Sequence, residues 1–191
     1  PIMQFVNNEW EEAKFVTDDI EKNVTEGKHY RDHMILSRSV YAARKIEAAC
    51  ISKKIPYIVF GGTTLMRSAH VRDVVSALRI LANFRDELAW MRYLMLWQGV
   101  GEVSASKIIE KMFSYASLGE CIDAVKSAKL REHAAHELLQ KICTLEKRPD
   151  AAIDIIVSEL DGIMARKHEN WDARKKDFTA LKIVAKRADS I

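Results

Sequence analysis

At 191 residues, of which 48% are hydrophobic and 30% charged, the chain has the composition of a folded globular protein and can bury the core of one domain or of two small ones. No stretch approaches the roughly 20 consecutive apolar residues of a membrane-spanning helix, so the sequence argues against a membrane protein. The net charge of +3 permits a nucleic-acid partner without indicating one. Three cysteines without a CxxC spacing indicate reduced core residues and a cytoplasmic protein.

The first 60 residues combine predicted strands with predicted helices. Short apolar runs predict strands at residues 2–6, 33–37 and 57–60. Apolar residues at three- and four-residue spacing predict helices at about 9–26 and 41–54. This alternation is typical of a small parallel sheet, so we expect a small α/β portion in residues 1–60.

Beyond this portion the periodicity predicts helices alone, and the fold class is therefore mainly α. The predicted helices span about 68–82, 86–96, 102–113, 117–127, 130–146, 149–167 and 170–188. Gly61 and Gly62 break the pattern before the first of them, and we interpret the pair as a hinge between two domains. The expected domains are residues 1–60 and an all-helical domain in residues 61–191.

Residues 96–109 have the pattern of a helix-hairpin-helix DNA-binding element. Glycines on both sides of an inward-pointing valine allow a sharp turn between two helices. Backbone N–H groups at the start of the second helix would then face outward and bind a phosphate without reading a base. The candidate DNA-binding residues are Gly99, Val100, Gly101, Ser104 and Lys107. The alternative is that the glycines only connect two helices of a bundle.

Longer segments resemble, in their order and spacing, the UvrD/Rep/PcrA-type DNA helicases of superfamily one. They are residues 34–39 (MILSRS), 44–48 (RKIEA), 55–62 (IPYIVFGG), 71–73 (VRD) and 78–83 (LRILAN), followed by the hairpin. The resemblance implies that residues 1–60 are part of the second RecA-like motor domain, called 2A, and that residues 61–191 are its inserted helical domain, called 2B. It also implies that Arg38, the family's motif IV arginine, lies near the single strand, where a guanidinium suits a phosphate.

The chain departs from the family pattern at three places. Val40 stands where the family has an asparagine shortly after the arginine, Leu65-Met66 replace an aromatic pair, and Trp97-Gln98 replace basic residues before the hairpin. Each change removes a side chain that would favour DNA. The resemblance therefore implies a divergent branch of the family.

An ATPase of this class needs a GxxxxGK[S/T] phosphate loop and a strand ending in Asp-Glu for magnesium, and the sequence contains neither. We expect no catalytic residue and no cofactor in this chain. The resemblance implies that ATP and Mg are bound in the full-length parent, an ATP-dependent helicase that unwinds in the three-prime to five-prime direction. The implied partners are duplex DNA, its junction with a single strand, and the remaining helicase domains. Because the chain opens directly on Pro1-Ile2-Met3, we expect it to be cut from a longer protein.

Other interpretations remain open. In the first, the chain is a protein-interaction module that docks a regulatory protein, and Trp97 then lies in an exposed apolar patch. In the second, it is a free-standing helix-hairpin-helix repair protein, which the α/β portion disfavours. His133 and His136 share a predicted helix but lack a third ligand at suitable spacing, so we expect no metal site. We expect Trp90, Trp97 and Trp171, as aromatic residues at helical spacing, in the core or partly buried rather than stacked on bases.

Overall fold

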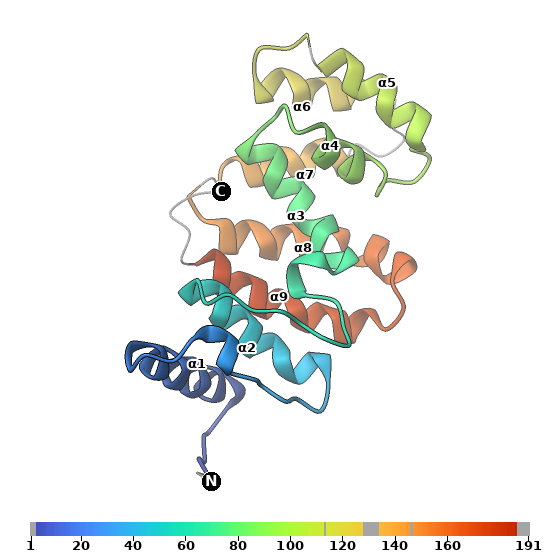
Figure 1. The fold of residues 1–191 in the computed structure, drawn as a ribbon. Coiled ribbons are helices and arrows are strands. Elements are labelled where there is room, and N and C mark those ends of the chain that lie inside the picture. Colours follow the sequence, from blue (N-terminus) through green and yellow to red (C-terminus); the bar gives the residue numbers. More distant parts are fainter. Residues whose placement is uncertain (1–2, 113, 128–133, 146, 187–191) are drawn as a thin grey trace.

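The computed structural model describes residues 3–112, 114–127, 134–145 and 147–186, and the chain is helical in these ranges (Figure 1). The first four helices are α1 (Glu9–Thr25), α2 (Val40–Lys53), α3 (Ala69–Ala82) and α4 (Glu87–Leu94). The next five are α5 (Glu102–Met112), α6 (Leu118–Ser127), α7 (Ala134–Cys143), α8 (Pro149–Lys167) and α9 (Trp171–Ala185). Two short 3-10 turns lie in the loops, at η1 (Tyr30–Asp32) and η2 (Leu65–Arg67).

The prediction of a mainly helical chain is confirmed, and side-chain caps explain where several helices begin. Asn8 accepts hydrogen bonds from the amides of Trp10 and Glu11 at 3.0 Å at the start of α1. Ser39 caps α2 and Asp86 caps α4 in the same way. Such caps satisfy amide groups that have no partner within the helix. None of the described helices is both long and apolar enough to cross a membrane.

The predicted α/β portion is wrong for the residues described, in which residues 3–60 contain no strand. The segments expected to be strands are extended or irregular loops, and Figure 1 shows the N-terminal one leading away from the helices. Six of their apolar side chains are between 79% and 88% exposed, those of Met3, Phe5, Met34, Leu36, Ile58 and Phe60. A strand needs a neighbour to take its backbone hydrogen bonds, and the apolar pattern alone does not supply one.

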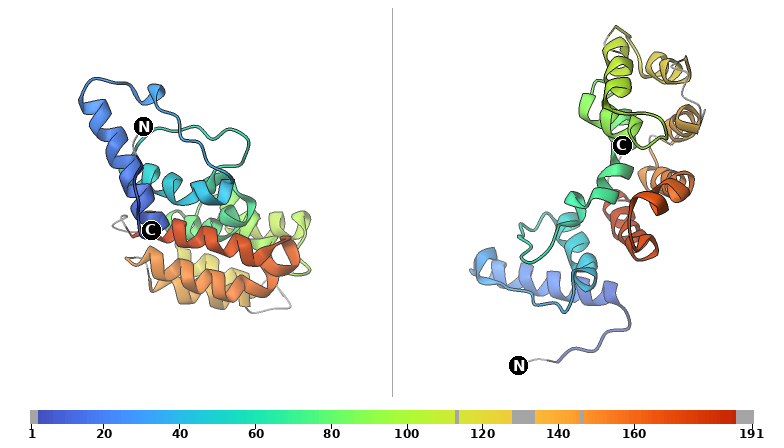
Figure 2. Two further views of the ribbon diagram at one scale, coloured as in Figure 1. Left: turned by 90° about the horizontal axis from the view of Figure 1, so that it is seen from below. Right: turned by 90° about the vertical axis from the view of Figure 1, so that its right-hand side faces the viewer.

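The helices form a chain of neighbours that turns back on itself. From α3 to α9 each helix packs on the next, α3 also packs on α8, and α9 returns to α2, which carries α1 (Figures 1 and 2). The large core runs through α3 to α9 and includes Ala48 of α2. A second, smaller cluster around Ala13, Ile20 and Ile46 lies between α1 and α2. The α1–α2 pair thus has a small core of its own and shares the large one.

Buried aromatic residues fix α4 within the core. Trp90 and Tyr93 are almost completely buried, and their rings meet edge to face with centroids 6.4 Å apart. The Trp90 indole donates a 2.8 Å hydrogen bond to the carbonyl of Phe84. The Tyr93 hydroxyl donates one of 2.6 Å to the carbonyl of Ala135, on α7. Both polar tips are therefore satisfied, and α4 is tied to a helix far from it in sequence.

A buried carboxylate joins α3 to α4 and to the end of α8. Asp73 is fully buried, and it lies 2.6 Å from Arg92 Nη1, 2.9 Å from Lys167 Nζ and 3.1 Å from His168 Nε2. Burial alone would raise the pKa of this carboxyl, but the contacts with Lys167, Arg92 and His168 outweigh it and hold the pKa below its ordinary value.

We expect Asp73→Asn to lower the free energy of unfolding by about 3 kcal/mol at neutral pH, because the cationic side chains of Arg92 and Lys167 lose their shared carboxylate and His168 loses its hydrogen-bond partner. A carboxyl with a lowered folded-state pKa stabilises the fold above its unfolded pKa, and this contribution disappears as the pH falls through the folded value. The difference between wild type and variant should therefore shrink below about pH 4.

Urea denaturation at pH 7 and at pH 3.5 measures this difference. Glu110→Gln, a change at an exposed residue of α5, serves as the control and should alter stability by no more than about 0.5 kcal/mol. An Asp73→Asn effect that is equal at both pH values would contradict the assignment.

Candidate nucleic-acid interface

The predicted hairpin is the connection between α4 and α5. The chain leaves α4 through tight turns, in which Trp97 N bonds to Leu94 O and Val100 N to Trp97 O, both at 3.2 Å. It enters α5 where the amide of Ala105 bonds to the carbonyl of Gly101 at 2.9 Å. Val100 is buried, so its side chain points inward as expected.

The two glycine positions of the hairpin differ in whether their backbone conformation requires glycine. Gly99 has φ +83°, a left-handed conformation that other residues adopt only with strain. Gly101 lies outside the positive-φ residues, and a Cβ there would meet nothing within 4 Å. The turn therefore requires glycine at Gly99, whereas the sequence analysis gave both glycines the same role.

The start of α5 presents unpaired donors to the surface. The first amides of a helix have no acceptor within it, and those of Glu102, Val103 and Ser104 belong to exposed residues. Lys107 is exposed and makes no ion pair among the described residues. Helical spacing places Ser104, Lys107 and Lys111 on one flank of the exposed face.

Acidic side chains share the exposed face. Glu102 lies away from Lys107 around the helix, whereas Glu110, three residues after Lys107, is its neighbour on the helix surface. Glu102 is in the first turn, where its charge complements the helix dipole and opposes an approaching anion. The exposed surface of α5 therefore carries charges of both signs, and its basic edge is formed by Ser104, Lys107 and Lys111.

Trp90 and Trp171 are core residues, as expected, and Trp10 is partly buried against the large core. Trp97 is also buried, at 5% exposure, and its ring meets Tyr93 edge to face with centroids 5.8 Å apart. The exposed apolar patch that a docking module would form around Trp97 is therefore absent at this residue. Exposed apolar side chains beside the hairpin are instead those of Met95 and Val103.

The other candidates lie elsewhere. Arg38 is exposed, in the loop before α2, and has no hydrogen bond or ion pair among the described residues. This loop and the hairpin lie at opposite ends of the molecule in Figures 1 and 2, so the structure does not bring Arg38 together with the hairpin. Among the described residues no three potential ligands lie close enough to hold a metal ion. His133 lies outside the described residues, and His136 is buried, 3.6 Å from Asp123.

Gly61 and Gly62 form part of the loop between α2 and η2. Gly61 has φ +75°, and a Cβ on Gly62 would lie 2.6 Å from Cγ2 of Val40, at the start of α2. The loop thus lies closely against α2, and Val40, which departs from the family pattern, forms that contact. The residues that hold this loop, Arg44 and Glu47, were not predicted as functional residues from the sequence. The feature of the sequence that could have indicated them is a pair of charged residues at positions of α2 that face neighbouring helices.

Comparison with known proteins gives the family. The model of the UvrD-like helicase C-terminal domain matches residues 2–181. The ATP-dependent DNA helicase PcrA of Staphylococcus aureus (strain Mu50) is 34% identical over 101 residues, which are 52% of this chain and 14% of that protein. The protein of the same description from Staphylococcus epidermidis (strain RP62A) is 32% identical over the same shares. The chain thus matches only a small part of these relatives, whereas the family model matches nearly all of it. The chain therefore belongs to the family of UvrD-like helicase C-terminal domains.

Proposed function

We propose that this chain is the part of an ATP-dependent DNA helicase of the UvrD/PcrA type that holds duplex DNA near its junction with a single strand. The observation that carries the proposal is the hairpin between α4 and α5. Its backbone turns at Gly99, Val100 anchors it in the core, and the exposed amides of the first turn of α5 lie beside Lys107. Backbone donors and a lysine bind phosphates without reading bases. The contact is therefore independent of DNA sequence.

The proposal assigns ATP and Mg to the rest of the helicase. The sequence has neither a phosphate loop nor a Walker B strand, so ATP hydrolysis and three-prime to five-prime movement belong to the parent protein. Residues 1–60 are part of motor domain 2A, and residues 61–191 are the 2B insert. The exposed apolar side chains of Met34, Leu36 and Ile58 support this division, because further strands of the same protein would cover them.

A second candidate function is docking of a regulatory protein. Leu88, Met95 and Val103 are exposed apolar residues on or beside α4 and α5, with exposed fractions of 75%, 45% and 70%. Leu88 and Met95 are seven residues apart, so they share one side of α4. Phosphate binding at the hairpin and docking beside it are separable by their dependence on salt.

Replacing Gly99 by valine should weaken binding to duplex DNA about tenfold, because a β-branched residue is strained at φ +83° and distorts the turn. Fluorescence anisotropy with a duplex bearing a three-prime single-stranded tail measures the affinity. Gly101→Ala is the matched control and should bind like wild type, since a Cβ there meets no atom. Unchanged affinity of Gly99→Val, with an intact circular dichroism spectrum, would remove the hairpin as the DNA site.

Lys107→Gln should reduce the slope of log affinity against log salt concentration by about one, because one phosphate contact is lost. The same anisotropy titration at four salt concentrations gives the slope. Lys176→Gln removes an exposed lysine of α9 and should leave the slope unchanged. Equal slopes for both variants would mean that Lys107 contacts no phosphate. Binding that is absent at every salt concentration would favour the docking function.

Arg38→Gln should weaken binding of the tailed duplex about fivefold and leave a blunt duplex unaffected, because Arg38 is proposed to contact the single strand. Comparison of the two DNA molecules in one titration series measures this difference. Arg31→Gln, at an exposed arginine of η1, is the control. An equal loss on both DNA molecules would show that Arg38 acts by general attraction rather than by contact with the tail.

A further inference from the structure

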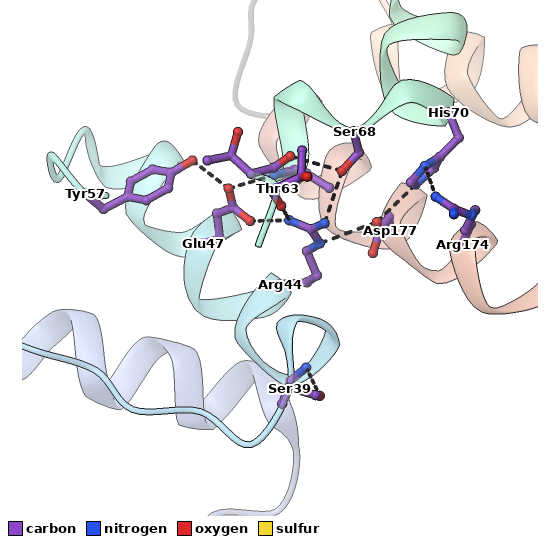
Figure 3. Close-up of polar contacts among 12 residues, drawn as sticks. Ser39, Arg44, Glu47, Tyr57, Thr63, Ser68, His70, Arg174 and Asp177 are labelled. Atoms are coloured by element: carbon purple, nitrogen blue, oxygen red, sulfur yellow. Dashed lines mark hydrogen bonds and ion pairs between the residues drawn. The ribbon is translucent and has the colours of Figure 1, made fainter. Parts of the chain in front are cut away.

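The loop that contains Gly61 and Gly62 rests on a buried ion pair of α2. Arg44 and Glu47 lie one turn apart, with side chains 7% and 5% exposed, and Arg44 Nη1 is 2.7 Å from Glu47 Oε2 (Figure 3). The charges of this pair are shielded from water and depend on each other and on their neighbours for compensation. The structural role of the pair therefore follows from the other groups that Arg44 and Glu47 contact.

Glu47 binds the chain on both sides of the two glycines. Its Oε1 atom accepts a 2.9 Å hydrogen bond from the Tyr57 hydroxyl, before Gly61, and one of 2.8 Å from the amide of Leu65, after Gly62. Partial burial and the bond to Glu47 raise the pKa of the Tyr57 phenol, so this hydroxyl stays protonated as a donor. One carboxylate thus closes the loop at its base.

Arg44 connects the loop to the helical body. Its Nη1 donates a 2.9 Å hydrogen bond to the carbonyl of Thr63, and its Nη2 donates one of 3.1 Å to Ser68 Oγ. Its Nε lies 3.4 Å from Asp177 Oδ2, on α9. The same oxygen of Asp177 is 3.0 Å from Nε2 of His70, on α3 (Figure 3). Arg44 therefore joins α2 to the loop through the backbone carbonyl of Thr63, and to α3 and α9 through the buried side chains of Ser68 and Asp177.

We propose that Arg44, Glu47 and Asp177 form a latch that makes the α1–α2 pair and the body of α3 to α9 move as one unit. The inference rests on the interpretation of Gly61 and Gly62 as a hinge between residues 1–60 and residues 61–191. The loop cannot turn while Glu47 holds both of its ends and Arg44 holds it to α9. If one of these charged side chains moves away, the others lose their ionic partner or become exposed to water. The contacts of the latch therefore break together, and the hinge has a closed and an open state.

The test is amide hydrogen exchange, followed by mass spectrometry, on the 191-residue chain with Arg44→Met. Methionine fills a similar volume without charge, and it removes the cation from both Glu47 and Asp177. We expect exchange to rise about tenfold or more in peptides from α1, α2 and residues 57–65, with α4 to α7 unchanged. Arg72→Met removes an exposed arginine of α3 and should match wild type throughout. Unchanged exchange in α1 and α2, or an equal rise along the whole chain, would overturn the latch.

A second pair of variants separates the latch from simple loss of stability. Asp177→Asn and the double variant with Arg44→Met are measured in the same way. For a direct link, the rise in exchange of the double variant should be smaller than the product of the two single rises. A rise equal to that product would overturn the Arg44–Asp177 connection. Duplex affinity of Gly99→Val is an independent measurement, so failure of the DNA proposal and failure of the latch are distinguishable.

Discussion

The return of α9 onto α2 decides how this molecule is assembled. Helix α2 lies near the N-terminal end of the described chain and α9 near its C-terminal end. Their contact therefore brings together the two ends of the segment that contains α3 to α8. Ala48 of α2 belongs to the same buried cluster as Phe178 and Leu181 of α9, so apolar packing is continuous across the contact. Arg44 and Asp177 lie within the same contact, and their geometry requires α3 to α8 to be in place. A contact between segments so distant in sequence closes a long loop, and its entropic cost is offset by the helices packed inside.

Three buried carboxylates define how the helices meet. Glu47, Asp73 and Asp177 belong to α2, α3 and α9, and each contacts at least one cationic side chain. Apolar surfaces of equal volume would stabilise the fold as well or better, since burying charge costs desolvation. We infer that these carboxylates contribute specificity. Two apolar helix faces can pack in several relative positions. A buried carboxylate between two fixed donors, in contrast, is satisfied in only one position of its helix.

The sequence predicted the helices because apolar periodicity and short-range capping are local properties. It also predicted the inward Val100, since a residue between two glycines at a helix junction has little alternative to the core. It failed for the strands, because Met34 and Leu36 alternate as strand residues do while nothing in the described chain pairs with them. It placed Trp97 in the core, because aromatic residues at helical spacing are more often buried than exposed, but it did not identify the ring of Tyr93 as the neighbour of Trp97. The buried pair of Arg44 and Glu47 depends on Asp177, and no local pattern connects residues so far apart.

The same reasoning explains why local charge matters more than net charge at the hairpin. A net charge of +3 provides little long-range attraction for DNA. On α5, however, Lys107 and Lys111 lie on the flank away from Glu102, so positive charge is concentrated along one edge of the exposed face, with Glu110 beside it. The backbone beneath is anchored by Val100 and by the bond from Tyr93 to α7, and it cannot retreat from a bound anion. A phosphate held there would meet a fixed array of donors that favours one side of α5. Under the proposed function, this geometry would set the orientation of the DNA backbone without any contact to a base.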